Sequence, residues 1–236
     1  NATQGWVPTI DEAVTDVPVV LNSEGIFGFG KTGSVVSMTN LVSNAGVVAT
    51  DVTGVGTARS RLAACEFGGD KGIFGFGHDG SVTAVTNLVS NAGVVATDTT
   101  GVGTARAELA ACGYGGDKGI FGFGHDGSSA VSLSNLVSNA GVVATDTTGV
   151  GTARVEPAAC EYGDDKGIFG FGNTGSLTAV TNLVSNAGVV ATDTAGVGTA
   201  REQLAACRYG GDKGIFGFGN ITGVSYTAIT NLVSNA

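Results

Sequence analysis

The hexapeptide Gly-Ile-Phe-Gly-Phe-Gly begins at Gly25, Gly72, Gly119, Gly167 and Gly214, so it recurs at steps of 47, 47, 48 and 47 residues. Two more markers keep this spacing: Asn-Leu-Val-Ser-Asn-Ala, which begins at Asn40, Asn87, Asn135, Asn182 and Asn231, and Gly-Val-Gly-Thr-Ala-Arg, which ends at Arg59, Arg106, Arg154 and Arg201. Self-similarity at a fixed period of roughly 40 to 50 residues indicates a repeat architecture. We therefore expect one tandem-repeat domain over residues 1–236.

Each unit contains four stretches that favour short strands. In one unit they are Leu109–Tyr114, Gly119–Gly124, Ser129–Val137 and Gly141–Asp146, which are rich in small or β-branched apolar residues and bounded by Gly, Asp, Asn or Ser. No window favours a helix. Four strands in a unit of this length are typical of a propeller blade, so the sequence predicts an all-β fold, a five-bladed β-propeller of four-stranded antiparallel blades.

The two ends of the chain suggest how such a ring closes. The last unit stops at Ala236, before its fourth strand, and residues 1–24 form the one divergent stretch. Gly5–Thr9 aligns with Gly46–Thr50, so we expect the N-terminal segment, with Trp6, to complete the last blade as a clasp and then to supply the first inner strand. Closure of this kind removes open sheet edges.

The repeat resembles the kelch propeller repeat over essentially the whole chain. Gly119–Gly124 resembles the kelch strand that ends in paired glycines, His125–Ser128 its following hairpin, and Thr104–Arg106 the small-residue and arginine step into the next blade. Kelch blades usually carry tryptophan on the outer strand, where this chain has valine (Val47, Val94, Val142 and Val189). Near-identical units also resemble repeat proteins of bacteriophage and environmental viruses. The resemblance implies a propeller that binds other proteins, in a virion or an extracellular setting.

Composition narrows the classes of partner. Twenty acidic and 11 basic residues give a net charge of -9, which works against binding to nucleic acid. No apolar run approaches the roughly 20 residues that span a bilayer, so we expect no membrane insertion. The hydrophobic fraction of 42% excludes a disordered chain.

Four cysteines, Cys65, Cys112, Cys160 and Cys207, occupy one equivalent position on the predicted inner strand. Two disulfides are one interpretation, but equivalent positions on neighbouring blades are expected to lie too far apart to bridge. Free thiols that act as small apolar residues are favoured, and without a C-x-x-C motif a metal site is not.

Four arginines, Arg59, Arg106, Arg154 and Arg201, also repeat. They are interpreted either as a ring that grips an anionic ligand or as ties between neighbouring blades through repeated acids such as Asp98 and Asp146. The second interpretation is favoured because repeated acids accompany every arginine. The Asp-Lys pairs that begin at Asp70, Asp117, Asp165 and Asp212 are interpreted as solvated turn charges.

The hairpin after the hexapeptide is where the units differ in length and sequence, and exposed loops on a rigid scaffold often bind ligands. The candidate ligand-binding residues are therefore His78, Asp79, His125, Asp126, Asn173 and Asn220. No catalytic motif, metal motif or cofactor is predicted, and the glycines of the hexapeptide lack the following helix that a phosphate-binding loop needs. Asn1 and Asn220 begin N-glycosylation triplets.

Two functions remain open at this point. The first is a non-enzymatic structural or interaction module, a component of a viral or extracellular appendage, that binds proteins or copies of itself. The second is a multivalent lectin with one weak glycan site per blade, built from the hairpins and from Phe67, Tyr114, Tyr162 and Tyr209. An enzyme is the least favoured class, because the units repeat the same residues.

Overall fold

The computed structural model describes residues 24–222 and 225–235, and all regular structure in this part is β-strand. The expected clasp, with Trp6 and the Asn1 triplet, lies outside the described residues. No helix of the described part is long and apolar enough to cross a membrane.

The strands form five antiparallel sheets that follow the repeat. The first sheet pairs β1 (Gly25–Lys31) with β2 (Val35–Val42). Each later sheet has an inner, a middle and an outer strand. The inner strands are β3 (Ala63–Phe67), β6 (Ala110–Tyr114), β9 (Ala158–Tyr162) and β12 (Ala205–Tyr209). The middle strands are β4 (Lys71–Gly75), β7 (Lys118–Gly122), β10 (Lys166–Gly170) and β13 (Lys213–Gly217). The outer strands are β5 (Thr86–Val89), β8 (Ser134–Val137), β11 (Thr181–Val184) and β14 (Thr230–Val233).

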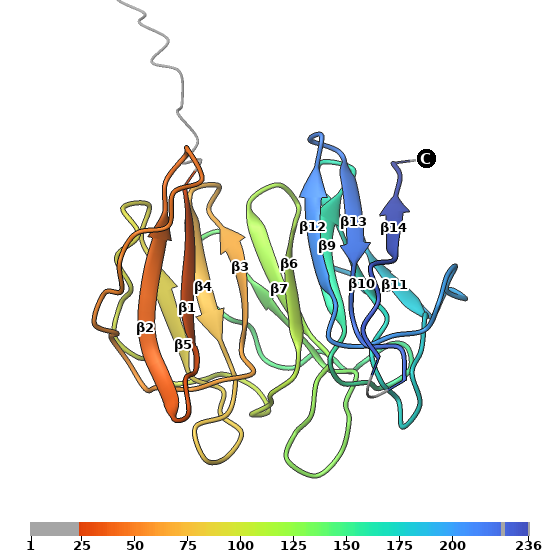
Figure 1. Ribbon diagram of the computed structural model, residues 1–236, viewed down its shortest axis with the longest axis horizontal. Coiled ribbons are helices and arrows are strands. Elements are labelled where there is room, and N and C mark those ends of the chain that lie inside the picture. Colours follow the sequence, from red (N-terminus) through yellow and green to blue (C-terminus); the bar gives the residue numbers. More distant parts are fainter. Residues whose placement is uncertain (1–23, 223–224, 236) are drawn as a thin grey trace, which may run out of the picture.

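The sheets are arranged in chain order, from β1 and β2 on the left of Figure 1 to β12–β14 on the right. Each inner strand contacts the inner strand of the next sheet, so β3, β6, β9 and β12 lie side by side. They also line a shared hollow of about 220 Å³. The sheets are not closed into a barrel.

The prediction of four strands per blade is wrong for the described sheets, which have at most three. The segment 141–147 forms no strand: it meets β8 through two isolated bridges, Val137 to Val143 and Ser134 to Thr147, and through the Ala144 N–H, which donates to the Leu136 carbonyl at 2.8 Å. The reason is a side chain: Nδ2 of Asn135 donates to the carbonyl of Ala144 at 3.0 Å and to Asp146 Oδ1 at 2.9 Å. The Ala144 carbonyl thus bonds a side chain of β8 where a regular ladder would use a backbone N–H.

In the four later sheets the hexapeptide strand is also shorter than expected. Phe123 has a φ of 63°, and Gly124 a φ of 99°, so the strand ends at Gly122. A left-handed conformation is uncommon for a residue with a side chain. It recurs at the equivalent positions Phe29, Phe76, Phe171 and Phe218.

The core lies between consecutive sheets rather than within one. One cluster joins Phe67, Ile73 and Phe76 to Leu109 and Phe121 of the next repeat. The rings of Phe76 and Phe121 meet edge to face with centroids 5.1 Å apart. Similar phenylalanine pairs join Phe29 to Phe74, Phe123 to Phe169 and Phe171 to Phe216.

Glycine permits this close approach of the sheets. A Cβ at Gly75 would lie 2.6 Å from the Phe121 ring, and one at Gly122 would lie 2.7 Å from Phe169. The repeated glycine between the two phenylalanines of the hexapeptide is therefore required by the next sheet.

We expect Gly75→Ala to lower the free energy of unfolding by about 1 to 3 kcal/mol, because the added methyl group overlaps the Phe121 ring. Gly72→Ala on the same strand is the matched control, since its Cβ would meet nothing nearer than the Val89 side chain at 3.6 Å. Denaturant titration measures both values. Equal stabilities for the two variants would contradict the close contact.

Candidate functional site

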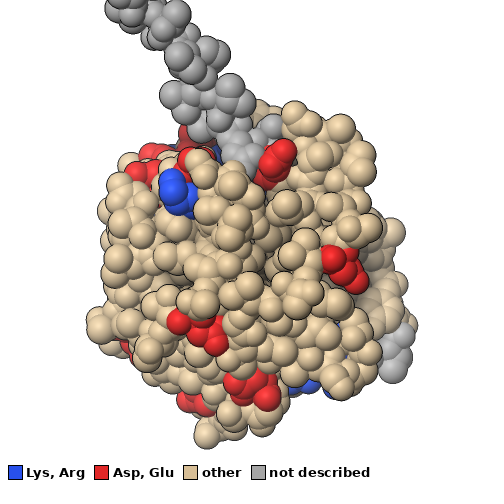
Figure 2. Space-filling view, turned by 90° about the vertical axis from the view of Figure 1, so that its left-hand side faces the viewer, with Lys and Arg blue, Asp and Glu red and all other residues tan. Residues whose placement is uncertain are grey.

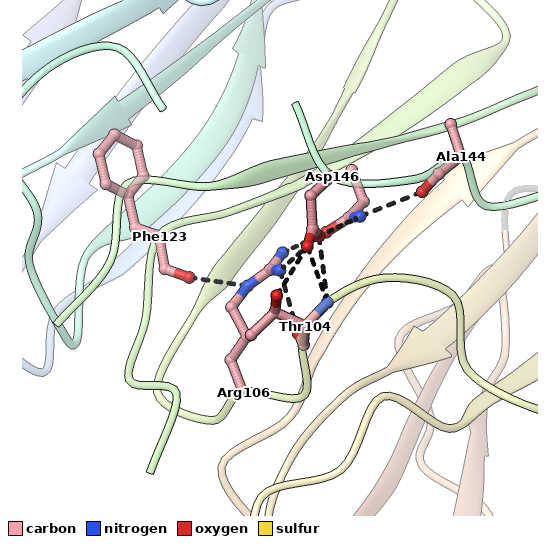
Figure 3. A network of polar contacts seen from close by, with 6 residues as sticks. Thr104, Arg106, Phe123, Ala144 and Asp146 are labelled. Carbon is pink, nitrogen blue, oxygen red and sulfur yellow. Dashed lines mark hydrogen bonds and ion pairs between the residues drawn. The ribbon is translucent and has the colours of Figure 1, made fainter. Parts of the chain in front are cut away.

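A completely buried arginine stands at each junction between successive sheets. The guanidinium of Arg106 lies over the ring of Phe76, 4.4 Å from its centroid. Its Nε donates to the carbonyl of Phe123 at 3.1 Å, and its Nη2 donates to Oδ1 of Asn135 at 2.5 Å (Figure 3). Because Phe76 and Phe123 belong to consecutive hexapeptides, Arg106 ties two sheets together.

Asp146 completes this network from the segment after β8. It accepts from the backbone N–H of Thr104 at 2.9 Å and from the Thr104 hydroxyl at 2.7 Å, and its Oδ1 lies 3.5 Å from Nη1 of Arg106 (Figure 3). Burial raises the pKa of Asp146, but the hydrogen bonds from Thr104 and Asn135 outweigh it, so its pKa is below the usual value. Burial lowers the pKa of Arg106 to about 10, so it stays charged at neutral pH.

The contact between arginine and phenylalanine recurs along the chain, but the full network does not: Nε of Arg154 and the Nη2 atoms of Arg59, Arg154 and Arg201 are buried without a hydrogen-bond partner among the described residues. Arg59 donates through Nε to the Phe76 carbonyl, and Arg201 donates to that of Phe218, each at 2.8 Å. Guanidinium groups also cover Phe29, Phe123 and Phe171. All four arginine side chains are fully buried, so none of them is open to solvent. Their role as ties between blades stays a prediction.

The cysteines lie on the four inner strands, and all of them are free. Cys112 and Cys160 are buried, Cys65 is half-buried and Cys207 is exposed. Burial raises the pKa of the Cys65 and Cys160 thiols to about 12, so both are protonated at neutral pH. They act as small packing groups beside the glycine that begins the next hexapeptide, such as Gly119.

The predicted ligand-binding residues lie in hairpins at the lower end of Figure 1, opposite the Asp-Lys turns, across the middle strands. Most of them shape their own hairpin. His78 Nδ1 accepts the N–H of Gly80 at 3.3 Å, and His125 Nδ1 accepts that of Gly127 at 3.0 Å. Asp126 Oδ1 accepts two backbone N–H groups in the same way.

Asn220 is buried, and its Oδ1 accepts the N–H of Thr222 at 3.0 Å. A glycan on this side chain would require it to leave its place, and glycosylation stays a prediction. Three of the four rings assigned to the lectin hypothesis, Phe67, Tyr114 and Tyr162, are buried, and only Tyr209 is exposed. The buried rings have no face free to stack on a sugar.

Two further positions at the hairpin end were missed by the sequence analysis. They follow the repeated arginine directly, and the first pairs with the base of a hairpin, as Ala107 does with His125. The first position holds Ser60, Ala107, Val155 and Glu202, and the second holds Arg61, Glu108, Glu156 and Gln203. The signal was available in the sequence, because these residues change from unit to unit beside an invariant stretch.

A third variable position faces the hollow between the inner strands, where Glu66, Gly113, Glu161 and Arg208 are equivalent. Arg208 donates to Glu161 at 2.6 Å. Burial raises the pKa of Glu161, with Arg208 opposing the shift and Glu66 adding to it. Within residues 24–222 and 225–235, no three His, Cys, Asp or Glu side chains converge as a metal site.

The sequence matches no protein-family model and no curated protein. The kelch resemblance therefore stays a prediction that rests on the residues quoted for it.

We expect Arg106→Lys to lower the free energy of unfolding by about 2 to 3 kcal/mol, because lysine keeps the charge but loses the planar fork and its hydrogen bonds. Arg61→Lys is the control, since Arg61 forms an exposed ion pair with Glu108 and should change stability by less than about 1 kcal/mol. Thermal and denaturant unfolding compare the two. A small effect at Arg106 would show that the buried network does not hold the sheets.

Proposed function

We propose that this protein is a non-enzymatic interaction module with the form of a five-bladed β-propeller, and that it binds protein partners through its hairpin end. We call this surface the hairpin face; it comprises residues 60–61, 78–82, 107–108, 125–130, 155–156, 173–177, 202–203 and 220–222.

The observation that carries the proposal is the contrast between shared and variable residues. The residues that join sheets, such as the buried arginines, the hexapeptide and the repeated Asn and Asp, are the same from unit to unit. The hairpin face varies more: its base is Lys31, His78, His125, Asn173 and Asn220 in turn, and the two positions after each arginine change between units, although four units share the Gly-Ser of the hairpin. A face that varies between several blades, while the junctions between sheets stay the same, suits recognition of one asymmetric partner.

The lectin alternative has less support. Avidity from equal sites needs the same residues in each blade. The hairpin face is where the blades differ, and the aromatic rings proposed to stack on sugars are mostly buried. We also expect no nucleic-acid partner, because the face in Figure 2 shows more acidic than basic side chains on a mostly uncharged surface and the net charge is -9.

Closure of the ring is part of the proposal. Phe218 is 60% exposed, whereas its equivalents Phe76 and Phe123 are at most 1% exposed. Phe27 is 64% exposed, whereas its equivalent Phe121 is fully buried. The open face of the last sheet and the open face of the first are therefore the two halves of the interface that already recurs four times.

A second contact supports the same closure. A Cβ at Gly141 would lie 2.9 Å from Leu88, and one at Gly188 would lie 2.8 Å from Leu136. At the two ends of the repeat, Gly46 has open space around it and Leu232 is exposed. Docking of the last sheet on the first would cover both.

Selection of a random-peptide display library on the protein tests the hairpin face. The variant His78→Ala with His125→Ala removes two side chains whose described hydrogen bonds stay within their own hairpins, so it should leave the sheets folded. Asp164→Gly, which restores the turn sequence of the other units at the opposite end, is the matched control. We expect the selected peptides to bind the hairpin variant at least tenfold more weakly and the control unchanged.

Two outcomes would overturn the proposal. Peptides that respond only to Asp164→Gly would place the binding surface at the other end. Glycan-array binding that the hairpin variant abolishes, with no peptide selected, would favour the lectin alternative.

A further inference from the structure

The hairpin face contains a cavity of about 390 Å³ between the hairpins that carry His78 and His125. Its walls include Arg61, Ala107 and Glu108. A ligand for this cavity would be recognised by the hairpin face, so its identification rests on the proposed function.

In a later repeat of this protein, the space equivalent to this cavity is filled by a side chain. Glu202 is the equivalent of Ala107, and each pairs through its backbone with its own hairpin base, Asn220 or His125. The carboxylate of Glu202 reaches the preceding hairpin, where Oε2 accepts from Asn173 Nδ2 at 2.7 Å. At Ala107 no such side chain exists, so the corresponding space is left as a cavity.

His78 is the equivalent of Asn173 at its own hairpin, and it can make the same kind of contact with a carboxylate. The Oδ1 of Asn173 accepts the N–H of Gly175 at 2.7 Å, and the Nδ1 of His78 accepts the equivalent N–H of Gly80 at 3.3 Å. An imidazole that accepts through Nδ1 carries its proton on Nε2 when it is neutral. The Nε2–H of His78 therefore corresponds to the Nδ2–H that holds the carboxylate of Glu202.

The charges around the cavity also suit a carboxylate. The carboxylate of Glu202 is accommodated although Glu156 lies nearby. Burial raises the pKa of Glu156, the charges of Glu108 and Glu202 raise it further, and a hydrogen bond from Gln203 opposes the shift. In the cavity, Glu108 is instead neutralised by Arg61 at 2.8 Å. The Arg61 side chain is more than half exposed and also lines the cavity, so a ligand there can reach its guanidinium. Asp79 on the adjoining hairpin uses Oδ1 to accept the Ser81 N–H.

We propose that this cavity binds a carboxylate group in the place that Glu202 fills between the later hairpins, with His78 Nε2–H and Arg61 as donors. An acidic side chain of a protein partner and a free small carboxylic acid share this chemistry, and the test separates them.

The test follows the imidazole signals of His78 and His125 by NMR while ligand is added to the full chain. The probes are acetate, a short peptide with one blocked glutamate, and the same peptide with glutamine. We expect saturable shifts of the His78 signals with the carboxylates and none with the glutamine peptide. Glutamate peptide binding at least tenfold tighter than acetate would identify a protein side chain as the source, and equal affinities a small carboxylic acid.

Ala107→Glu supplies the carboxylate from within the chain, as Glu202 does, and should abolish the shifts. Ser60→Glu is the matched control, because it adds the same group at the equivalent position outside the cavity, and it should leave them intact. Shifts with the glutamine peptide, or unaltered binding by Ala107→Glu, would overturn the inference. If neither carboxylate binds while the selected peptides still depend on His78 and His125, the ligand class is wrong but the interaction face stands.

Discussion

The buried arginine between successive sheets is the contact on which the rest of this fold depends. Arg106 covers the Phe76 ring of one hexapeptide and donates to the Phe123 carbonyl of the next. Phe123 is also the residue that leaves the strand with a positive φ. The arginine thus bonds the carbonyl of an unfavourable backbone conformation and fixes the neighbouring sheet in the same contact. A buried charge without such partners would be strongly destabilising. The positions of Asp146, Asn135 and the Phe123 carbonyl are therefore fixed by the need to bond Arg106.

This constraint accounts for the uniform residues at the junctions between sheets, whereas the hairpins vary more. A junction in which glycine meets a phenylalanine ring tolerates little change on either side, and the same junction recurs four times in the described residues. The hairpins extend beyond the junction and contribute little to it, so their residues are free to differ. The middle part of each middle strand therefore packs against the next sheet and stabilises the fold. The hairpin that follows the strand belongs to the hairpin face, which we propose binds a partner.

The repeat, the strand class, and the placement of the cysteines, arginines and hairpins followed from the sequence because they depend on periodicity and on local propensity. The fourth strand did not, because a side chain, Asn135, occupies the carbonyl of Ala144 that a ladder would use. The length of the hexapeptide strand was missed for a similar reason: the positive φ of Phe123 is held by an arginine from the preceding segment. The cavity beside Ala107 needed the structure, since its likeness to the Glu202 contact depends on which side chain reaches the preceding hairpin.

The central claim is that one interface joins every pair of neighbouring sheets, including the last and the first. Gly217 tests it most directly, because a Cβ there would meet only Thr230 at 3.5 Å while the ring is open and would meet Phe27 once the last sheet docks on the first. The measurement is the free energy of unfolding of Gly217→Ala in denaturant. The account predicts a loss of about 1 to 3 kcal/mol, as for an overpacked core position. Unchanged or slightly increased stability would contradict it and would mean that the two end faces stay apart.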